Sequence, residues 1–335
     1  MRRYHLTAPG LDHLVLREEA PPAPSAGEIV MRPRCVSLNA RDLMVLHGYL
    51  PNAKPDLTPL SDGAGEVIAV GAGVEQLKPG DRVVAAFRPA WTDGPPEPYQ
   101  ATSDLGGPAD GVLGEWVLLP EAGVVKLPEH VSLEAAASLP CAGVTAWRSL
   151  TGGRPLRADE TVLVQGTGGV SLFALAIARN FGCRVIATTS SDAKADILRR
   201  LGAETVIDYT RTPDWQIEVM KATGGRGVDR IVEVGGPGTL PRSMACIAPL
   251  GEIAFVGMQD DPGGQVSPIP LIGRCASIRG IAVGSVADLA TLLAEVAAGR
   301  LAPVIDQTFA FEAAADAYRR LQGRQHVGKV LISVL

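Results

Sequence analysis

The sequence predicts an α/β protein with two domains, one rich in β-strands and one built on a doubly wound parallel sheet. In residues 1–125, short apolar runs alternate with prolines and glycines, which is typical of an all-β region. From residue 162 onward, apolar strands alternate with helical segments, and this alternation requires a parallel sheet covered on both faces. A glycine-rich turn at residues 166–169 separates the first of these strands from the first helix.

The N-terminal region consists of short strands separated by glycine and proline turns. Strands are expected at residues 14–16, 28–31, 65–70 and 81–85, with turns at 71–73 and 78–81. Residues 91–111 are polar and rich in turn-forming residues, which favours a loop. A helix is expected at residues 132–139, where Ser132 can serve as the N-cap.

The rest of the chain follows the strand–helix alternation until a connection rich in proline and glycine begins after residue 262. Strands are expected at residues 162–165, 184–188, 205–208, 228–234, 251–257, 277–283 and 329–333. Helices are expected at residues 169–181, 192–201 and 286–299.

The glycine-rich turn has the spacing of a dinucleotide-binding fingerprint. Gly166 permits the tight turn, and Gly168 lets the backbone approach a pyrophosphate held by the N–H groups that open the helix. Ser171 stands where a third glycine is usual, and it is still small enough for close packing. The turn alone is a weak signal, but the alternation that follows strengthens it. We expect cofactor contacts from Gly166, Thr167, Gly168, Gly169 and Val170.

The choice between NAD and NADP is made after the second strand, where an NAD site usually has an acid that binds the ribose 2′-hydroxyl. Here the position is Thr189, followed by Ser190, Ser191 and Lys194. Two hydroxyls and an ammonium could bind a 2′-phosphate, and Tyr209 could add its hydroxyl. Alternatively, Ser191 caps the next helix, Lys194 lies in solvent and Tyr209 simply ends its strand. The missing acid favours the phosphate, so we expect NADP(H).

The composition argues against several classes of function. The net charge of −5 gives no electrostatic case for binding nucleic acid or an anionic membrane. No apolar run reaches the ~18 residues needed to span a bilayer, and the N-terminus lacks the apolar core of a signal peptide. The five cysteines are scattered without a Cys-x-x-Cys pair, which argues against a disulfide framework or a zinc lobe. We expect a cytoplasmic protein whose partner is a small molecule.

Five short segments serve as landmarks of a known organisation, and they lie at residues 37–42, 62–67, 78–83, 142–146 and 327–330. With them, the chain resembles the medium-chain dehydrogenases/reductases over essentially all 335 residues. It looks closest to the zinc-free quinone oxidoreductase and enoyl reductase branch, and to zinc-type alcohol dehydrogenase-like proteins that have lost the metal. The resemblance implies a GroES-like catalytic domain at residues 1–126, completed by 263–335, and a Rossmann dinucleotide-binding domain at 127–262.

The resemblance also bears on metal binding. Zinc-dependent relatives hold the metal at positions that correspond here to Asn39, Ser61 and Cys141. One thiolate cannot hold Zn²⁺, which takes three protein ligands and an open position. The expected loop at 91–111 also lacks the four cysteines of a structural zinc lobe. We expect no metal, and therefore a substrate that is already electrophilic, such as a conjugated carbonyl or a quinone.

Candidate catalytic residues follow from the same resemblance. Asn39 resembles an asparagine beside the nicotinamide, and Tyr49 lies near a family tyrosine, with His47 as the alternative proton donor. For Tyr49 and His47, a surface or packing role stays open beside catalysis. Asp42 is expected to orient or cap locally rather than to act as a base. Thr145 resembles a threonine near the nicotinamide carboxamide. Further expected cofactor contacts are Val234, Val256 and Val283.

Two classes of function stay open. One is an NADPH-dependent reductase of enones, quinones or related carbonyls, with a zinc-free alcohol or aldehyde dehydrogenase-like enzyme as its variant. The other is a cofactor-binding protein with a structural or regulatory role. Substrate specificity is expected to reside in the loops at 47–60, 91–111 and 259–285. The edge strand expected at 277–283 predicts a homodimer, because pairing removes an exposed edge.

Overall fold

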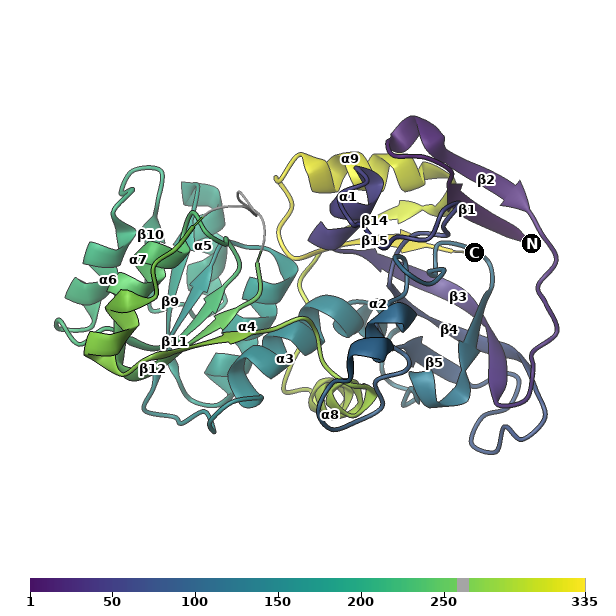
Figure 1. The fold of residues 1–335 in the computed structure, drawn as a ribbon, viewed down its shortest axis with the longest axis horizontal. Coiled ribbons are helices and arrows are strands. Elements are labelled where there is room, and N and C mark those ends of the chain that lie inside the picture. The colour runs from purple at the N-terminus through teal and green to yellow at the C-terminus, as the bar shows by residue number, and fades with distance from the viewer. Residues whose placement is uncertain (258–264, 335) are drawn as a thin grey trace. The chain divides into compact units, whose positions relative to one another are not determined.

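The computed structural model describes residues 1–257 and 265–334. The chain divides into two compact units (Figure 1). The first unit comprises Met1–Val144 and Val283–Leu335, and the second comprises Thr145–Ala282. Within the described residues, no helix combines the length and apolar character needed to cross a membrane.

The first unit is built on a sheet whose strand order is β14-β15-β3-β4-β5-β7, with β6 paired to one end of β3. Its strands are β3 (Glu28–Leu38), β4 (Asp62–Val70), β5 (Arg82–Ala85), β6 (Val117–Pro120), β7 (Val124–Lys126), β14 (Ile305–Ala310) and β15 (Lys329–Ser333). A Cβ at Gly65 would lie 2.0 Å from the carbonyl oxygen of Arg32, so glycine lets β4 approach β3 at this point. A separate antiparallel pair joins β1 (Arg2–Leu6) and β2 (Leu14–Glu18).

Strand β15 comes from the far end of the sequence and lies between β14 and β3. It runs antiparallel to β3, with Val330 opposite Leu38 and Ser333 opposite Cys35. This register brings the start of β15 to the end of β3, where the chain enters α1 (Ala40–Leu46). Residues from both ends of the sequence therefore meet at one corner of the sheet.

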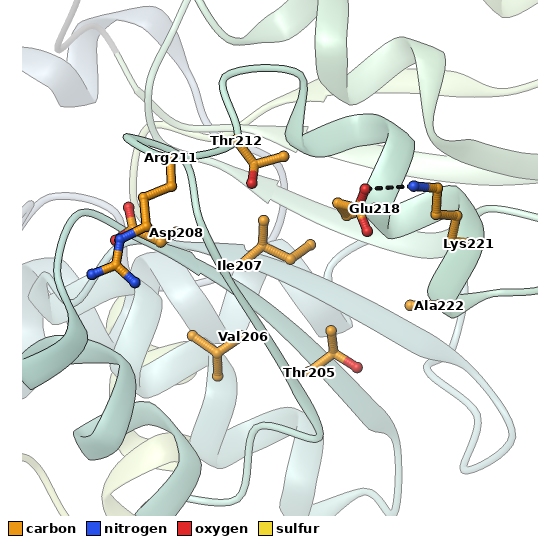
Figure 2. Close-up of a pocket in the computed structure, with 9 residues that line it drawn as sticks. All are labelled: Thr205, Val206, Ile207, Asp208, Arg211, Thr212, Glu218, Lys221 and Ala222. Atoms are coloured by element: carbon orange, nitrogen blue, oxygen red, sulfur yellow. Dashed lines mark hydrogen bonds and ion pairs between the residues drawn. The ribbon is translucent and has the colours of Figure 1, made fainter.

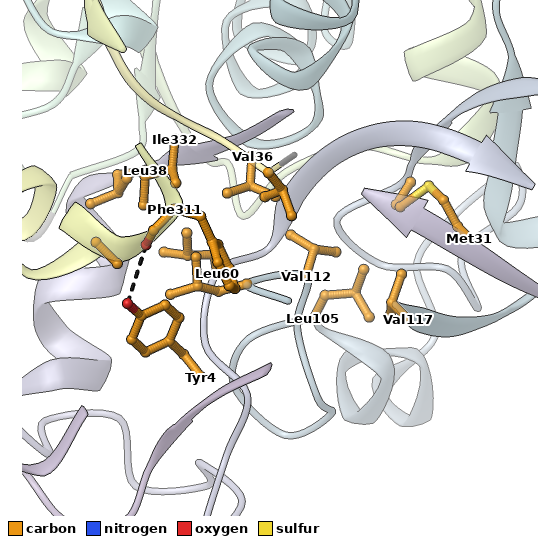
Figure 3. Close-up of a cluster of buried hydrophobic side chains, with 14 of the residues drawn as sticks. Tyr4, Met31, Val36, Leu38, Leu60, Leu105, Val112, Val117, Phe311 and Ile332 are labelled. Atoms are coloured by element: carbon orange, nitrogen blue, oxygen red, sulfur yellow. Dashed lines mark hydrogen bonds between the residues drawn. The ribbon is translucent and has the colours of Figure 1, made fainter. Parts of the chain in front are cut away.

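Apolar side chains from all parts of the first unit form its core (Figure 3). Tyr4 packs edge-on against Phe311 with ring centroids 5.1 Å apart, and its hydroxyl donates to the Phe311 carbonyl at 3.2 Å. The α-helices that the structure describes in this unit are α1, α2 (Leu133–Ala137), α8 (Val286–Ala297) and α9 (Ala314–Gln322). Helix α2 packs on β3 and β4, whereas α9 packs on β14 and β15 and touches α1.

The second unit is a six-stranded parallel sheet with the order β10-β9-β8-β11-β12-β13. Its strands are β8 (Thr161–Gln165), β9 (Arg184–Thr189), β10 (Thr205–Asp208), β11 (Val228–Glu233), β12 (Ile247–Phe255) and β13 (Ser277–Gly280). Every residue of β8 and β11 is buried, so both faces of the central strands are covered. The order reverses between β8 and β11, which is where sheets of this type bind nucleotides.

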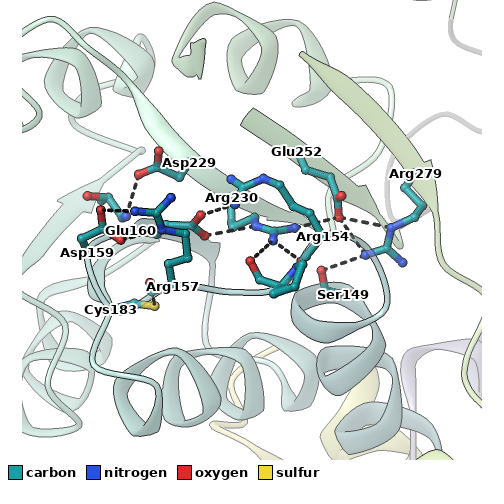
Figure 4. A network of polar contacts seen from close by, with 12 residues as sticks. Ser149, Arg154, Arg157, Asp159, Glu160, Cys183, Asp229, Arg230, Glu252 and Arg279 are labelled. Atoms are coloured by element: carbon teal, nitrogen blue, oxygen red, sulfur yellow. Dashed lines mark hydrogen bonds and ion pairs between the residues drawn. The ribbon is translucent and has the colours of Figure 1, made fainter. Parts of the chain in front are cut away.

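Helix α3 (Val144–Thr151) precedes the first strand of this sheet, and the connections from β8 to β12 contain α4 (Gly169–Asn180), α5 (Asp192–Arg200), α6 (Trp215–Ala222) and α7 (Leu240–Ala245). A buried ion-pair network joins four segments of the unit around Arg230 (Figure 4). The Arg230 guanidinium lies 3.3 Å from Glu160 and 3.1 Å from Glu252. Arg279 of β13 pairs with the same Glu252 at 2.8 Å, so the edge strand is tied to the interior of the sheet.

The expected helix at residues 132–139 is divided in the structure. The α-helix ends at Ala137, and a π-helical turn follows at Leu139–Gly143. Pro140 has no N–H to donate to the preceding turn, which interrupts the α-helical hydrogen bonding. The expected strand at 277–283 is also shorter, because β13 ends at Gly280.

The boundaries of the two units differ from those of the expected domains in two segments of the chain. Residues 127–144 were expected in the second unit, but α2 and the π-helical turn pack against β3, β4 and α8 of the first. Residues 263–282 were expected in the first unit, yet β13 extends the parallel sheet beside β12. Part of the expected specificity loop, residues 259–264, lies outside the described residues.

Candidate functional site

The glycine-rich turn leaves open space beside its backbone. Gly166 has a φ of 75°, a conformation that glycine adopts without strain, and its N–H donates to the Thr188 carbonyl at 2.8 Å. A Cβ at Gly166 or Gly168 would meet no other atom within 4 Å. Gly168 caps α4 without a side-chain hydrogen bond, so the first N–H groups of the helix remain for an anion. Ser171 donates to the Gln165 carbonyl at 2.6 Å and thereby closes the turn.

The residues expected at the 2′-phosphate lie at the carboxyl ends of neighbouring strands. Thr189 ends β9, and the N–H of Tyr209 donates to its carbonyl at 2.9 Å. The Thr189 side chain is buried, and its hydroxyl oxygen has no hydrogen-bond partner among the described residues. An unsatisfied buried hydroxyl is costly and would be satisfied by a bound polar group. Ser190 is half-buried and adjacent to this position.

Ser191 caps a helix in the structure, which is the alternative to phosphate binding that the sequence left open. Its hydroxyl accepts from the Lys194 N–H at 3.4 Å and caps α5. Capping uses the backbone N–H of Lys194, and the residue is half-buried at the start of α5. The open turn and the orphaned Thr189 hydroxyl both fit a dinucleotide cofactor.

A hydrogen-bond network that the sequence did not predict links the ends of β8 and β11, where the strand order of the parallel sheet reverses. The Gln165 side chain donates to Glu233 at 2.8 Å and accepts from the Val234 N–H at 3.1 Å. Glu233, which is fully buried, also accepts from the Gly235 N–H at 2.9 Å. Val256 follows β12, and its N–H donates to the Glu233 carbonyl at 2.9 Å. Val234 and Val256 are therefore brought to one edge of the sheet.

A pocket elsewhere on the second unit is lined by residues of β10, of α6 and of the loop between them (Figure 2). Its charged groups are already paired, since Lys221 lies 2.7 Å from Glu218 and Arg211 contacts Asp192 and Asp208. None of the expected cofactor residues lines this pocket. Arg211 is still notable, because it neutralises Asp192 at the first position of α5, immediately after Ser191.

Other expected residues are distributed between the two units. Thr145 is buried in α3 of the second unit, whereas Val283 is buried at the start of the second segment of the first unit. His47 and Tyr49 belong to the first unit, and both side chains are exposed, Tyr49 by 71%. Their ring centroids lie 5.8 Å apart, across a turn at Gly48 whose φ is 73°. Within residues 1–257 and 265–334, neither side chain hydrogen-bonds to Asn39.

Asn39 lies in a buried polar cluster where β3, β4 and β15 meet. Its side-chain oxygen accepts from the Lys329 ammonium, which also donates to the Leu38 carbonyl at 2.8 Å. The Asn39 side-chain nitrogen lies 3.5 Å from the Ser61 hydroxyl. That hydroxyl donates to Asp62 at 2.6 Å, and Asp62 lies 3.8 Å from the Lys329 ammonium. Every one of these side chains is less than a tenth exposed.

Asp42 completes the local geometry of Asn39. Its carboxylate accepts from the Asn39 N–H at 2.7 Å, and the two residues form a capping box at the start of α1. Burial raises the pKa of Asp42 from 3.8 to about 6, against the opposing influence of Arg41. Asp42 thus orients the backbone at Asn39, as the sequence suggested.

The three positions at which relatives hold zinc do not suit that metal here. The Asn39 oxygen already faces an ammonium, which would repel a cation. The Ser61 hydroxyl donates to Asp62 and is a weak ligand. Burial, followed by the charge of Asp62, raises the pKa of the Cys141 thiol well above its ordinary value, whereas zinc binds the thiolate. No group of three or more potential metal ligands is found among the described residues.

Sequence reasoning did not assign roles to Lys329, Asp62, Gln165 or Glu233. Asp62 and Lys329 lie within the landmark segments 62–67 and 327–330. A lysine inside a terminal apolar strand was the available signal for Lys329. Gln165 and Glu233 could have been found as polar residues that end buried strands.

Family models match both units. An alcohol dehydrogenase GroES-like domain matches residues 25–129, and a zinc-binding dehydrogenase domain matches residues 169–298. A zinc-type alcohol dehydrogenase-like protein of Schizosaccharomyces pombe is 39% identical, over 97% of this chain and 96% of the relative. An acryloyl-coenzyme A reductase of Metallosphaera sedula is 28% identical, over 95% of this chain and 96% of the relative.

A solved structure shows the same arrangement of elements. The quinone oxidoreductase of Pseudomonas syringae pv. tomato DC3000 is 27% identical, with a TM-score of 0.85 over 99% of both chains. The matched models, the full-length likeness to the S. pombe protein and the shared fold agree on one assignment. The chain belongs to the medium-chain dehydrogenase/reductase superfamily, a family of oxidoreductases that use nicotinamide cofactors.

Proposed function

We propose that this protein is an NADPH-dependent, zinc-independent reductase of quinones, enones or related carbonyl compounds. The observation that carries the proposal is the Asn39–Lys329 contact at the position where relatives hold zinc. Without a Lewis acid, a plain ketone or alcohol is a poor partner for hydride transfer. A quinone or an enone is already electrophilic at the accepting carbon and requires less activation.

The proposed cofactor site uses residues of the second unit. The backbone at Gly166, Thr167, Gly168, Gly169 and Val170 would hold the pyrophosphate at the start of α4. Thr189 and Ser190 would donate hydroxyl hydrogen bonds to the 2′-phosphate, and Lys194 would add a charge-assisted bond. The orphaned hydroxyl of Thr189 supports this placement.

Remaining residues orient the nicotinamide end and the substrate. Thr145, Val234 and Val256 of the second unit would pack against the nicotinamide and exclude water, and Val283 stays an expected cofactor contact. Bound NADPH supplies the hydride, so the protein needs no nucleophile of its own. Its task is to place the accepting carbon and to stabilise the negative charge that develops on the substrate oxygen.

The likeness to relatives supports the substrate class without fixing it. One relative is named as an acryloyl-coenzyme A reductase and another as a quinone oxidoreductase, and both names describe electron-poor acceptors. Steady-state oxidation of NADPH, measured against benzoquinone, cyclohexenone and cyclohexanone, tests the proposal. We expect turnover with the first two acceptors and little with the saturated ketone. Equal rates with all three, or no NADPH oxidation with any, would contradict it.

A further inference from the structure

Lys329 is an unusual residue for the interior of a protein, because its long cationic side chain is almost fully buried. It opens β15, and the pairing of Val330 with Leu38 carries its side chain to the end of β3. Gly328 precedes it with a φ of 84°, and a Cβ there would lie 2.1 Å from the Val304 carbonyl oxygen. The backbone therefore holds Lys329 in a fixed position.

The ammonium group directs its hydrogens at specific acceptors. One goes to the Leu38 carbonyl at 2.8 Å, and another goes to the side-chain oxygen of Asn39. The counter-ion Asp62 is 3.8 Å away, too far for a direct hydrogen bond. Asp62 instead accepts from the Ser61 hydroxyl at 2.6 Å and the Cys141 N–H at 3.0 Å. The positive charge is thus neutralised only in part and acts directly on Asn39.

This contact determines which way the Asn39 amide points. An ammonium group carries donors only, so only the amide oxygen can face it. The NH₂ group must then face the other way, where Ser61 at 3.5 Å is its one acceptor among the described residues. Asp42 fixes the backbone of the same residue through the 2.7 Å hydrogen bond from the Asn39 N–H. The amide has one orientation, with a donor directed away from Lys329.

We infer that Lys329 is a positioning residue that holds and polarises the Asn39 amide, so that its N–H donates to the substrate oxygen during hydride transfer. When hydride reaches the electron-poor carbon, a C–H bond forms, the π electron pair moves to the substrate oxygen and NADPH becomes NADP⁺. The Asn39 N–H accepts no charge and loses no proton, but its hydrogen bond stabilises the oxyanion until a separate donor protonates the product. The inference rests on the proposed function, because it gives Asn39 a substrate oxygen to bind.

The ammonium strengthens this donor through the amide. A cation at the oxygen draws electron density from the nitrogen, so the N–H becomes a better hydrogen-bond donor. Relatives with zinc bring a cation directly to the substrate oxygen. Here the cation is one amide group further away, which suits acceptors that need modest activation.

A double-mutant cycle of Lys329→Met and Asn39→Ala tests the inference with cyclohexenone as the acceptor. Asn39→Ala should lower kcat by about 10²–10³, as expected for loss of one oxyanion donor. Lys329→Met should lower kcat by at least about tenfold, and NADPH affinity measured by fluorescence should stay within about twofold. In the double variant, Lys329→Met should add almost nothing to the loss from Asn39→Ala. Multiplied losses, or an unchanged kcat in either single variant, would overturn the inference.

Two further variants separate positioning from stability. Lys126→Met removes an exposed lysine that pairs with Asp81 at 2.8 Å in the same unit, and it should leave kcat unchanged. Asn39→Asp keeps an acceptor for Lys329 but removes the donor, so it should fold and still lose kcat. This variant decides the question if Lys329→Met does not fold, because full activity in Asn39→Asp would exclude an amide donor. If the native protein does not oxidise NADPH with any acceptor, the proposed function is wrong together with this inference. If the native protein is active and the Asn39 and Lys329 variants are equally active, only this inference is wrong.

Discussion

Thr189 and Lys194 are the side chains that decide the choice of cofactor in our proposal. The buried Thr189 hydroxyl has no partner among the described residues, and no acid stands at the end of β9 to repel a phosphate. A charge-assisted hydrogen bond to the 2′-phosphate contributes about 1.5–3 kcal/mol. We therefore expect Lys194→Ala to weaken NADPH binding by roughly tenfold or more and to leave NADH binding nearly unchanged. Calorimetric titration with both cofactors measures this, and equal affinities in the native protein would contradict it.

Asp42 predicts a pH dependence of stability with a definite sign. Its pKa in the folded protein is about 6, above the ordinary 3.8, so the folded state takes up this proton first as the pH falls. Between these two values, rising pH ionises a buried carboxyl and costs stability. Asp42→Asn retains an acceptor for the Asn39 N–H but has no charge. Its free energy of unfolding relative to the native protein should therefore rise by about 2 kcal/mol between pH 4 and 6.

Chemical denaturation at a series of pH values measures this difference. The comparison between the two proteins matters, because the exposed carboxylates titrate equally in both. Parallel stability curves for the native protein and Asp42→Asn would show that Asp42 has an ordinary pKa.

Tyr49 is the first candidate for the proton donor, and its 71% exposure makes it accessible to substrate and water. A general acid contributes about 10²–10⁴-fold, so Tyr49→Phe should lower kcat without altering NADPH affinity. Quinones need less proton transfer than enones, and their loss should be smaller. His47→Ala is the matched variant, since the two rings lie 5.8 Å apart. Loss of kcat only in His47→Ala would move the role to His47, and full activity in both would indicate water.

At the scale of elements, the sequence predicted the parallel sheet well because its strands are buried on both faces. β8 and β11 are wholly buried, and in β8 this burial appears as the continuous apolar run Val162–Val164, whereas β11 keeps Ile231 and Val232 between charged residues that pair inside the unit. Strand β14 was missed because its residues are mostly exposed or half-buried and follow no apolar run. Helix α9 was missed as well, because two of its four buried residues are alanines and the helix has no clear apolar stripe of large side chains.

The polar cluster around Asn39 was beyond sequence reasoning for a different reason. Asn39 and Lys329 are separated by 290 positions, and only the pairing of β15 with β3 brings them together. The glycine turn, by contrast, is a local feature whose residues follow one another, so the fingerprint was visible. Local motifs were predicted, and contacts made by the fold were not.

Strand β13 is the element that predicts assembly. It pairs with β12 on one side, and most of its residues are exposed, including Ile278 at 36%. Ile269 and Ile272, just before it, are 70% and 75% exposed. An apolar edge strand that has no outer partner in the described part of the chain is an aggregation hazard, and pairing with a second copy removes it. We expect a homodimer, seen in light scattering as about twice the 35.0 kDa chain mass.

The dimer prediction has a matched pair of variants. Ile278→Lys places a charge on the edge strand and should shift the protein toward the monomer. Ile217→Lys places the same charge on α6, at a residue that is 50% exposed, and should leave the mass unchanged. A monomeric native protein at micromolar concentration would rule out a stable dimer.

For the molecule as a whole, metal content is the simplest test of the proposed chemistry. The Lys329 ammonium against Asn39 and the raised pKa of the Cys141 thiol both disfavour a divalent cation. Purified protein should contain no stoichiometric zinc, and chelators should leave NADPH oxidation intact. Elemental analysis that finds one zinc per chain would show that the ligand positions have been misassigned.

The position of β15 has a consequence for how the chain is made. The second unit is continuous in sequence, so it can fold as soon as residue 282 has left the ribosome. The first unit cannot complete its sheet until β15 emerges nearly fifty residues later, and until then β3 lacks its partner on that side. A nascent chain therefore exposes an apolar strand edge for the whole synthesis of the second unit. Truncation before residue 329 would leave that edge permanently unpaired. The pairing of β15 with β3 is therefore the last step in forming the native first unit.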